Sequence, residues 1–405
     1  MAAKLEQDVA AAALAALNTA EGKADPYPHY ARLRALGPAV TSADGMLVVT
    51  GYRQSAALMR DHRLQKMPEL ILLAAGHHDW RDRPSLRLMY TSVLVLNPPE
   101  HTRLRRLISA AFTIRRVAGL RPAIERITAE TCERVEGSTD FVTDFAFPLP
   151  VTVIGELLGI PPADRAAFQP LVRDWTMVLE DLSPAAVDRA DAAAVTIRDY
   201  LTDLAAARRA KPADDLISAM MTALDDNEAL DAEAVVTMAA LLFAAGFETT
   251  TGLLTNGLLA LLAAPEQAAR LRTEPEIAAP AVEELLRYDS PVQFMSTRSA
   301  PTDLTIAGID FAEGQRVLNL VGAANRDPAV FDEPDRLVLD RAAEPPLSFG
   351  GGVHYCVGAP LARLEGQIAF PALLSRFPRL ALAGTPVIRQ GLALHSYTSV
   401  PVTTN

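Results

Sequence analysis

The segment from about Glu233 to Ala264 is apolar on nearly every side, and it is roughly three times the mean helix length of ~11–12 residues. A transmembrane helix needs ~20 mostly apolar residues, so length alone permits a membrane span. Glu248 lies near the middle, where a charge costs about 2.5–3.5 kcal/mol on insertion scales. Asn256 adds a second polar group. The central helix of a large buried core is therefore favoured over a membrane span.

Composition supports a chain that can build such a core. Of the 405 residues, 50% are hydrophobic, which excludes a disordered protein. No linker or internal repeat divides the chain, so we predict a single domain over 1–405, mainly α with a smaller β portion. The N-terminal extension, residues 1–24, carries the apolar run Val9–Leu17 without a preceding basic segment, which predicts a short helix and no signal peptide.

Periodicity predicts most of the remaining elements. Helical spacing of apolar residues is clearest in five segments, namely Tyr52–Asp61, His101–Phe112, Leu120–Glu136, Val187–Arg209 and Ile277–Tyr288. Met46–Val49 reads as a strand, and Leu304–Ile309 with Arg316–Leu320 reads as a hairpin. The turn-rich tail from Leu380 to Thr404 is predicted to be β structure.

Charge and cysteine content exclude several classes of function. The net charge of −11 argues against non-specific nucleic-acid binding. Only two cysteines occur, Cys132 and Cys356, which excludes both a disulfide scaffold and a zinc site built on paired cysteines. Reduced thiols fit a cytoplasmic protein, and no membrane anchor is expected.

The middle of the long helix is locally weakened. Gly246 costs ~1 kcal/mol relative to alanine in a helix interior, and Thr249 to Thr251 are restricted in side-chain rotation. Glu248 thus stands beside a hydroxyl within an apolar wall. Two interpretations remain open from these residues: a packing kink with a satisfied carboxylate, or a proton relay and ligand groove next to a cofactor.

A second distinctive segment runs from Phe349 to Gly358. The three consecutive glycines, 350–352, let the backbone approach a flat ligand closely or adopt positive φ. Cys356 stands just before a predicted helix, whose free amides and dipole stabilise a thiolate. The thiolate would be a nucleophile or a metal ligand, whereas Cys132 reads as an ordinary buried cysteine. A Cys/His hydrolase is the competing interpretation, although no acyl-transfer signature surrounds His354 and Cys356.

Together these segments resemble the cytochrome P450 family. The loop matches Phe-x-x-Gly-x-His-x-Cys-x-Gly at every fixed position, and residues 245–249 match Ala-Gly-x-Glu-Thr. Glu284 and Arg287 match the family's Glu-x-x-Arg, and the resemblance implies that Arg336 completes a buried triad with them. Residues 97–105 look like the helix that binds haem propionates, and 144–162 look like the bacterial soluble, ferredoxin-dependent branch.

The resemblance implies a P450 fold that holds haem b between the long central helix and the cysteine loop. Cys356 would be the proximal iron ligand, a thiolate that favours O–O cleavage. The implied propionate ligands are His101, Arg105, Arg298 and His354. The other implied haem contacts are Ala245, Phe349, Gly350 and Gly358.

The same resemblance implies the distal chemistry. Thr249 would hydrogen-bond dioxygen, and Glu248 would relay protons from solvent. The implied activity is insertion of one oxygen atom of O2 into an apolar small molecule, with a polyketide or another secondary metabolite as the expected substrate. A peroxide-driven peroxygenase and a non-catalytic haem-thiolate sensor are the alternatives.

Two further sets of residues follow from the resemblance. A ferredoxin, which receives electrons from its reductase, would dock on a basic stretch that contains Arg103, Arg106, Arg115 and Arg116. The expected substrate-pocket residues are Leu241, Ala244, Ala245, Phe294, Met295, Trp175, Val178, Tyr397 and Thr398.

Overall fold

The computed structural model describes residues 2–225, 231–295, 298–389, 391 and 393–405. They form two compact units, each assembled from separate stretches of chain. The first unit contains residues 1–65, 128–147 and 249–405, and the second contains 66–127 and 148–248. The predicted mainly helical fold with a smaller β portion is confirmed.

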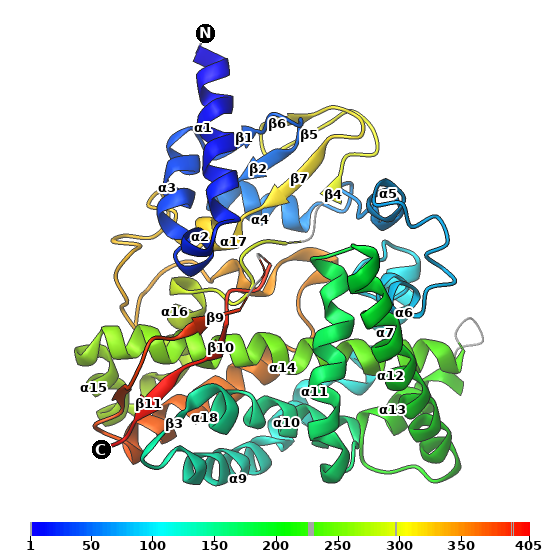
Figure 1. Cartoon of the computed structure of the whole chain (residues 1–405), viewed down its shortest axis with the longest axis vertical. Coiled ribbons are helices and arrows are strands. Elements are labelled where there is room, and N and C mark those ends of the chain that lie inside the picture. Colours follow the sequence, from blue (N-terminus) through cyan, green and yellow to red (C-terminus); the bar gives the residue numbers. More distant parts are fainter. Residues whose placement is uncertain (1, 226–230, 296–297, 390, 392) are drawn as a thin grey trace. The chain divides into compact units, whose positions relative to one another are not determined.

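The first unit combines helices with the β structure (Figure 1). Its helices are α1 (Ala2–Leu17), α2 (Ala20–Ala24), α3 (Tyr27–Ala35), α4 (Tyr52–Arg60), α15 (Pro265–Thr273), α16 (Ala278–Tyr288), α17 (Val321–Ala324) and α18 (Ala359–Arg376). A π-helical turn covers Val142–Ala146, and 3-10 turns cover Glu133–Val135, Pro275–Ile277, Leu347–Phe349 and Gly352–His354.

The main sheet has the strand order β1-β2-β7-β4, made from Ala39–Thr41, Leu47–Val49, Arg316–Asn319 and Arg298–Ser299. β1 and β2 form an antiparallel hairpin, and β2 pairs in parallel with β7 so that Val48 lies opposite Leu318. Val48 packs with α1 and α3 on one face, whereas Leu47 and Val49 belong to a second cluster. This alternation is the two-residue period of a strand buried on both sides.

One expected strand pairing is wrong. The hairpin joins β5 (Leu304–Ile306) to β6 (Ile309–Phe311), and β7 pairs with β2 and β4 instead. Ala307 and Gly308 both have positive φ, 52° and 75°, which makes a two-residue turn inside the segment expected to be a single strand. In the tail, β9 (Val387–Ile388) pairs with β10 (Tyr397–Ser399), and β11 (Pro401–Thr403) lies between β3 (Ser138–Asp140) and β8 (Ala381–Leu382).

The second unit is helical. It contains α5 (Pro68–Ala74), α6 (Pro84–Tyr90), α7 (Glu100–Ala111), α8 (Ile114–Gly119), α10 (Pro148–Leu158), α11 (Pro162–Thr176), α12 (Pro184–Ala210) and α13 (Leu216–Asp225), with a 3-10 turn at Met177–Leu179. Helix α9 (Arg121–Cys132) begins in this unit and ends in the first. All five helices expected from periodicity are present within a few residues of the expected bounds.

Helix α14 (Ala232–Ala263) continues from the second unit into the first. Among the described residues, α14 is the one continuous helix that is long and apolar enough to cross a membrane. However, 78% of its most apolar stretch is buried inside the protein. Its glycines permit close helix contacts. A Cβ atom on Gly246 would lie 2.8 Å from Ile154 of α10, and one on Gly257 would lie 2.4 Å from the ring of Phe370 on α18.

Candidate active site

The cysteine loop is held by its own backbone. Cys356 lies three residues before the first residue of α18, and its amide donates to the Phe349 carbonyl over 3.0 Å. Gly350 and Gly352 have φ values of 72° and 63°, which favour glycine. A Cβ atom on Gly352 would also lie 2.9 Å from the Met59 carbonyl oxygen. Two of the three glycines are therefore required by the course of the loop.

Two glycines of this segment leave space near the thiol. Gly350 and Gly358 carry no side chain, and the position of a Cβ atom at Gly358 lies 3.8 Å from Cys356 Sγ. A Cβ atom placed on Gly350 would lie 3.5 Å from the methyl carbon of Met295, which is the nearest side-chain atom. The missing side chain at Gly358 therefore leaves room beside the sulfur for a flat ligand.

The two cysteines have different surroundings. Cys132 is 5% exposed, and burial raises the pKa of its thiol to about 11, with a smaller opposing effect from Arg376. Cys356 is half-buried at the loop. This difference supports the prediction that Cys132 is structural and that Cys356 is available to a ligand.

Arg363 braces the loop, and sequence inspection did not identify it. Its guanidinium lies 4.4 Å from the centroid of the Phe349 ring, and its Nη1 donates to the Tyr355 hydroxyl over 3.0 Å. Its Nη2 also donates to Glu283 on α16 over 3.0 Å. The bond to Glu283 raises the pKa of Arg363 above its ordinary value, although burial opposes this effect. The ring and cation contact stabilises Phe349 against α18.

The second candidate segment lies on α14. Ala244 and Phe247 are buried, at 3% and 0% exposure, but Ala245 between them is exposed. Gly246, Glu248 and Thr249 are half-buried. One side of an otherwise buried helix is thus accessible at the residues that carry the acid and the hydroxyl.

Glu248 has a cationic neighbour within the second unit. Its Oε1 lies 3.7 Å from Nε of Arg173 on α11, and the two side chains are 11% and 43% exposed. Gly246 brings α10 close to the same turn, because its missing Cβ leaves room for Ile154. Arg173 is a second functional candidate that the sequence pattern did not reveal, since its partner lies 75 positions further along the chain (248 − 173).

The triad near α16 needs a correction. Glu284 and Arg287 form the expected buried pair, with Arg287 Nε 2.7 Å from Glu284 Oε2 and both side chains 2% exposed. The third member is Arg341, whose Nε lies 3.1 Å from Glu284 Oε1, and not Arg336. Arg336 is 66% exposed and pairs with Glu333, three residues before it. Its backbone carbonyl accepts from Arg287, so its side chain extends elsewhere.

Comparisons with known proteins identify relatives of this chain. The family model described as Cytochrome P450 matches residues 167–389. The chain is 39% identical over 379 residues to cytochrome P450 monooxygenase PikC of Streptomyces venezuelae, covering 90% of this chain and 86% of that protein. It is 37% identical over 397 residues to 6-deoxyerythronolide B hydroxylase of Saccharopolyspora erythraea, covering 93% and 96%.

A solved structure, P450BioI in complex with an acyl carrier protein ligated to hexadec-9Z-enoic acid, matches with a TM-score of 0.87 and 34% identity, covering 95% of this chain and 100% of that one. The chain belongs to the cytochrome P450 family. Its fold is the P450 fold, its cofactor is haem b, and its reaction class is that of the P450 monooxygenases. The missing side chain at Gly358, where a Cβ atom would lie 3.8 Å from Cys356 Sγ, leaves room for the flat macrocycle.

The candidate propionate ligands of this P450 are divided between the two units. His101 and Arg105 lie four residues apart on α7. His101 is 2% exposed, and Arg105 is half-buried. Arg298 and His354 lie in the first unit, where Arg298 Nη1 donates to the carbonyls of Leu58 and Met59 over 3.2 Å each. Burial lowers the pKa of Arg298 against a smaller opposing effect of Asp61. Arg298 thus also caps the end of α4.

Two of the expected pocket residues are not on a cavity wall. Trp175 and Val178 have no exposed surface, and Trp175 Nε1 donates to the Ser85 carbonyl over 3.1 Å, so both are core residues of the second unit. Thr398 is exposed and donates to the Val387 carbonyl, and the Tyr397 ring packs on His395 at a centroid distance of 5.8 Å. Side-chain size and polarity in the sequence could not separate core from lining positions.

The other expected pocket residues lie on different faces of their helix or extended segment. On α14, Leu241 is 7% exposed and lies on the same side as the exposed Ala245, four residues later. Met295 extends toward Gly350 of the cysteine loop. Phe294, its neighbour, lines a different cavity beside α1 and α2. Extended backbone turns consecutive side chains to opposite faces, which explains why these two residues separate.

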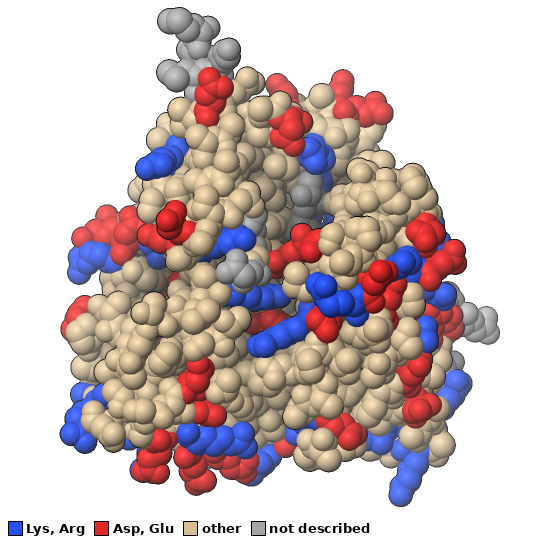
Figure 2. Space-filling model, viewed as in Figure 1, with Lys and Arg blue, Asp and Glu red and all other residues tan. Residues whose placement is uncertain are grey.

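The basic stretch is only partly available to a partner. Arg103, Arg106 and Arg115 are exposed. Arg116 is half-buried, and its Nη2 forms an ion pair of 3.0 Å with Asp214. On the one face drawn in Figure 2, basic and acidic side chains lie interspersed.

Proposed function

We propose that this P450 is a ferredoxin-driven, cytoplasmic monooxygenase that inserts one oxygen atom of O2 into an apolar small molecule of the polyketide or another secondary-metabolite class. The observation that carries this proposal is the adjacent acid and alcohol, Glu248 and Thr249, on the accessible side of α14. An acid next to a hydroxyl can move a proton in defined steps from solvent to a bound substrate. Thr249 and Cys356 both belong to the first unit.

Haem, when bound through Cys356, supplies the activation of dioxygen, and the thiolate favours O–O cleavage. The protein's own residues supply protons. The Thr249 hydroxyl is assigned to hold dioxygen and one water by hydrogen bonds, and the Glu248 carboxylate is assigned to bring protons from solvent. Arg173, 3.7 Å from Glu248, orients the carboxylate as a positioning residue.

The apolar substrate class is supported by the residues of α14. Leu241, Ala244 and Ala245 present aliphatic side chains, and a small side chain at Ala245 leaves room for a bulky substrate. The names of two relatives, 6-deoxyerythronolide B hydroxylase and the polyketide biosynthesis cytochrome P450 PksS of Bacillus subtilis, suggest secondary metabolism. We therefore place macrocyclic or polycyclic apolar compounds first in a substrate screen.

The ferredoxin assignment is based on local charge. Arg103, Arg106 and Arg115 are exposed within a chain of net charge −11, and exposed basic side chains attract an acidic partner. Association steered by such charges slows as salt screens them, because the Debye length falls from ~10 Å at 0.1 M to ~3 Å at 1 M. Electron transfer is therefore expected to slow steeply with ionic strength.

The deciding experiment compares two oxidant systems. Product is measured with a ferredoxin, its reductase and NADPH, and separately with hydrogen peroxide alone, for the wild type and for Thr249→Ala. The proposal expects turnover with the reductant system, and expects Thr249→Ala to release more peroxide and to form less product per NADPH consumed. Thr251→Ala, two residues further along, is the matched control. Efficient turnover with peroxide alone, or unchanged coupling in Thr249→Ala, would overturn it.

A further inference from the structure

A buried cluster of polar side chains lies behind the entry to the cysteine loop, within the first unit. It consists of Ser290, Asn325 and Ser348, which are 0%, 0% and 7% exposed. Ser290 follows α16, Asn325 follows α17, and Ser348 stands directly before Phe349. Buried polar groups in folded proteins are nearly always hydrogen-bonded, so the bonds of this cluster indicate which segments it holds together.

The Ser348 hydroxyl uses its full hydrogen-bonding capacity. It donates to the Leu286 carbonyl over 2.8 Å, and it accepts from the Ser290 hydroxyl over 2.7 Å and from Asn325 Nδ2 over 2.9 Å. A hydroxyl has one donor and two acceptor sites, so all three sites are occupied. Leu286 lies in the last turn of α16, where backbone carbonyls generally lack a partner within the helix. Ser348 thus ties the loop entry to the end of α16.

Asn325 binds two consecutive residues of the loop entry. The Leu347 amide donates to Asn325 Oδ1 over 2.8 Å, which leaves Nδ2 to donate to Ser348. This orientation of the side-chain amide is required, because a backbone N–H can only donate and must face the oxygen. The Asn325 carbonyl also accepts from Arg287 Nη1 over 3.0 Å. Asn325 therefore connects the loop entry to the buried pair of Glu284 and Arg287.

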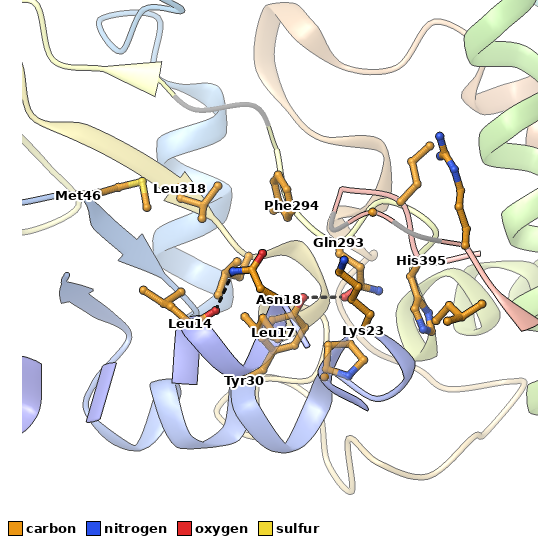
Figure 3. Close-up of a pocket in the computed structure, with 17 residues that line it drawn as sticks. Leu14, Leu17, Asn18, Lys23, Tyr30, Met46, Gln293, Phe294, Leu318 and His395 are labelled. Atoms are coloured by element: carbon orange, nitrogen blue, oxygen red, sulfur yellow. Dashed lines mark hydrogen bonds between the residues drawn. The ribbon is translucent and has the colours of Figure 1, made fainter. Parts of the chain in front are cut away.

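Ser290 is held from its other side by Gln293. Gln293 Nε2 donates to the Ser290 carbonyl over 2.7 Å, and Gln293 Oε1 accepts from the Tyr30 hydroxyl over 3.0 Å. Figure 3 shows this bond between Tyr30 and Gln293. Tyr30 and Gln293 are 3% and 2% exposed, so the segment that contains Ser290 is fixed in the core of the unit. The cluster therefore has a buried support.

The position of Cys356 depends on the loop entry. The Phe349 carbonyl accepts from the Cys356 amide over 3.0 Å, and the Gly350 amide donates to the Leu347 carbonyl over 2.8 Å. Between Phe349 and Cys356 the chain reaches the surface, where Val353 is 43% exposed. Exposed loop segments open more readily than buried backbone. The bond between Phe349 and Cys356 therefore transmits the placement of the buried entry to the cysteine.

We propose that Asn325 and Ser348 are positioning residues for haem ligation, which fix the loop entry so that Cys356 remains bound to the iron as a thiolate. Both residues act through the backbone of residues 347–349, and neither contacts the substrate position on α14 in this assignment. Ser290 has a supporting role, because its hydroxyl reaches the loop entry through the Ser348 side chain. The proposal is independent of the substrate and of the electron donor.

The experiment follows the reduced carbon monoxide adduct of the haem-loaded wild type and variants over time. The long-wavelength Soret band of thiolate ligation is recorded at a temperature at which circular dichroism shows every variant to be folded. Asn325→Ala removes both side-chain bonds to the loop entry, and Ser348→Ala removes the bond to Leu286. Ser290→Ala is the matched control, because it also deletes one hydroxyl from the buried cluster. If Asn325→Ala does not fold, Ser348→Ala decides the test.

The proposal expects the thiolate band to decay about tenfold faster in Asn325→Ala and about fivefold faster in Ser348→Ala than in the wild type, because each variant loses hydrogen bonds that hold the loop. Ser290→Ala should decay within about twofold of the wild type, although its unfolding midpoint falls. The double variant should decay less than about fiftyfold faster, because Asn325 and Ser348 share one bond. Unchanged decay in either folded single variant, or an equal acceleration in Ser290→Ala, would overturn the proposal.

Discussion

Arg341 Nε lies 3.1 Å and 3.2 Å from the two carboxylate oxygens of Glu284, a residue 57 positions earlier in the chain. Glu284 also accepts hydrogen bonds from two nitrogens of Arg287 and from the Val338 amide. The carboxylate, with 2% side-chain exposure, thus accepts five hydrogen bonds from three residues. A buried charge is stable only when it is paired and bonded in this way. The loop after α17 is thus fixed to α16 through one acid.

Removal of Arg341 is therefore expected to destabilise the protein more than removal of Arg336. Arg341→Ala should lower the free energy of unfolding by about 2 kcal/mol, because it deletes charged hydrogen bonds to a buried acid. Arg336→Ala should leave the unfolding midpoint nearly unchanged, since its pair with Glu333 is exposed. Chemical unfolding of the haem-loaded variants measures both, and a larger loss in Arg336→Ala would contradict the assignment.

The buried pair of Asp289 and His395 predicts a pH-dependent stability. Burial acts to raise the pKa of Asp289, but the charge and hydrogen bond of His395, the Tyr27 hydroxyl and Arg326 outweigh it and lower the pKa. The pKa of His395 is raised in turn. The histidine contribution is complete below the unfolded pKa of ~6.5 and is lost as pH rises through the folded pKa. The aspartate contribution is present above ~3.9 and is lost as pH falls.

The pair should consequently stabilise most between about pH 4 and pH 6.5. The difference in unfolding free energy between the wild type and Asp289→Asn should be larger at pH 6 than at pH 9. His78→Gln, which changes an exposed histidine, serves as the control and should show no such trend. A difference that stays constant or grows toward pH 9 would show that the pair is not coupled as described.

Arg173 should influence proton delivery through Glu248. Arg173→Gln removes the cation 3.7 Å from Glu248 Oε1, so the carboxylate loses its orientation and product formation should slow by about tenfold. The solvent deuterium isotope effect on turnover should increase, because proton transfer becomes more limiting. Arg198→Gln, an exposed arginine paired with Asp199 on α12, is the control. An unchanged isotope effect in Arg173→Gln would remove Arg173 from the relay.

The close contact of α14 with α18 should tolerate no added methyl group. In Gly257→Ala, the new Cβ would lie 2.4 Å from Cζ of Phe370, which is 1% exposed. Overpacking of this kind costs about 2 kcal/mol. Phe370→Leu in the same chain should recover part of that loss, which a double-mutant cycle measures. Gly119→Ala, with no atom within 4 Å of the new Cβ, should be neutral, and additive single losses would contradict the contact.

Local patterns predicted the helices and the cysteine loop well. The helix bounds followed from apolar spacing, and the loop followed from its glycines and its cysteine, because both depend on residues close in sequence. The turn at Ala307 and Gly308 was missed, since an alanine seldom takes positive φ and therefore gives no turn signal. Strand partners such as β2 and β7, about 270 residues apart, leave no local pattern.

The site residues also fall into those that a local pattern identifies and those that depend on contacts distant in sequence. Glu248, Thr249 and Cys356 stand in short motifs and could be named from the sequence. Arg341, Arg363 and Arg173 act across long separations, and any of the many arginines would have suited each role. Trp175 and Phe294 show the limit for apolar residues, because the sequence does not tell which wall a buried ring faces.

The central claim is that Cys356 binds haem iron as a thiolate. The most direct test is the absorption spectrum of the reduced carbon monoxide adduct for the wild type, Cys132→Ser and Cys356→Ser. The wild type and Cys132→Ser should show the long-wavelength Soret band of a thiolate-ligated haem, and Cys356→Ser should lose that band or the haem itself. A wild type that absorbs like an imidazole-ligated globin, or a Cys356→Ser variant that keeps the thiolate band, would contradict the claim.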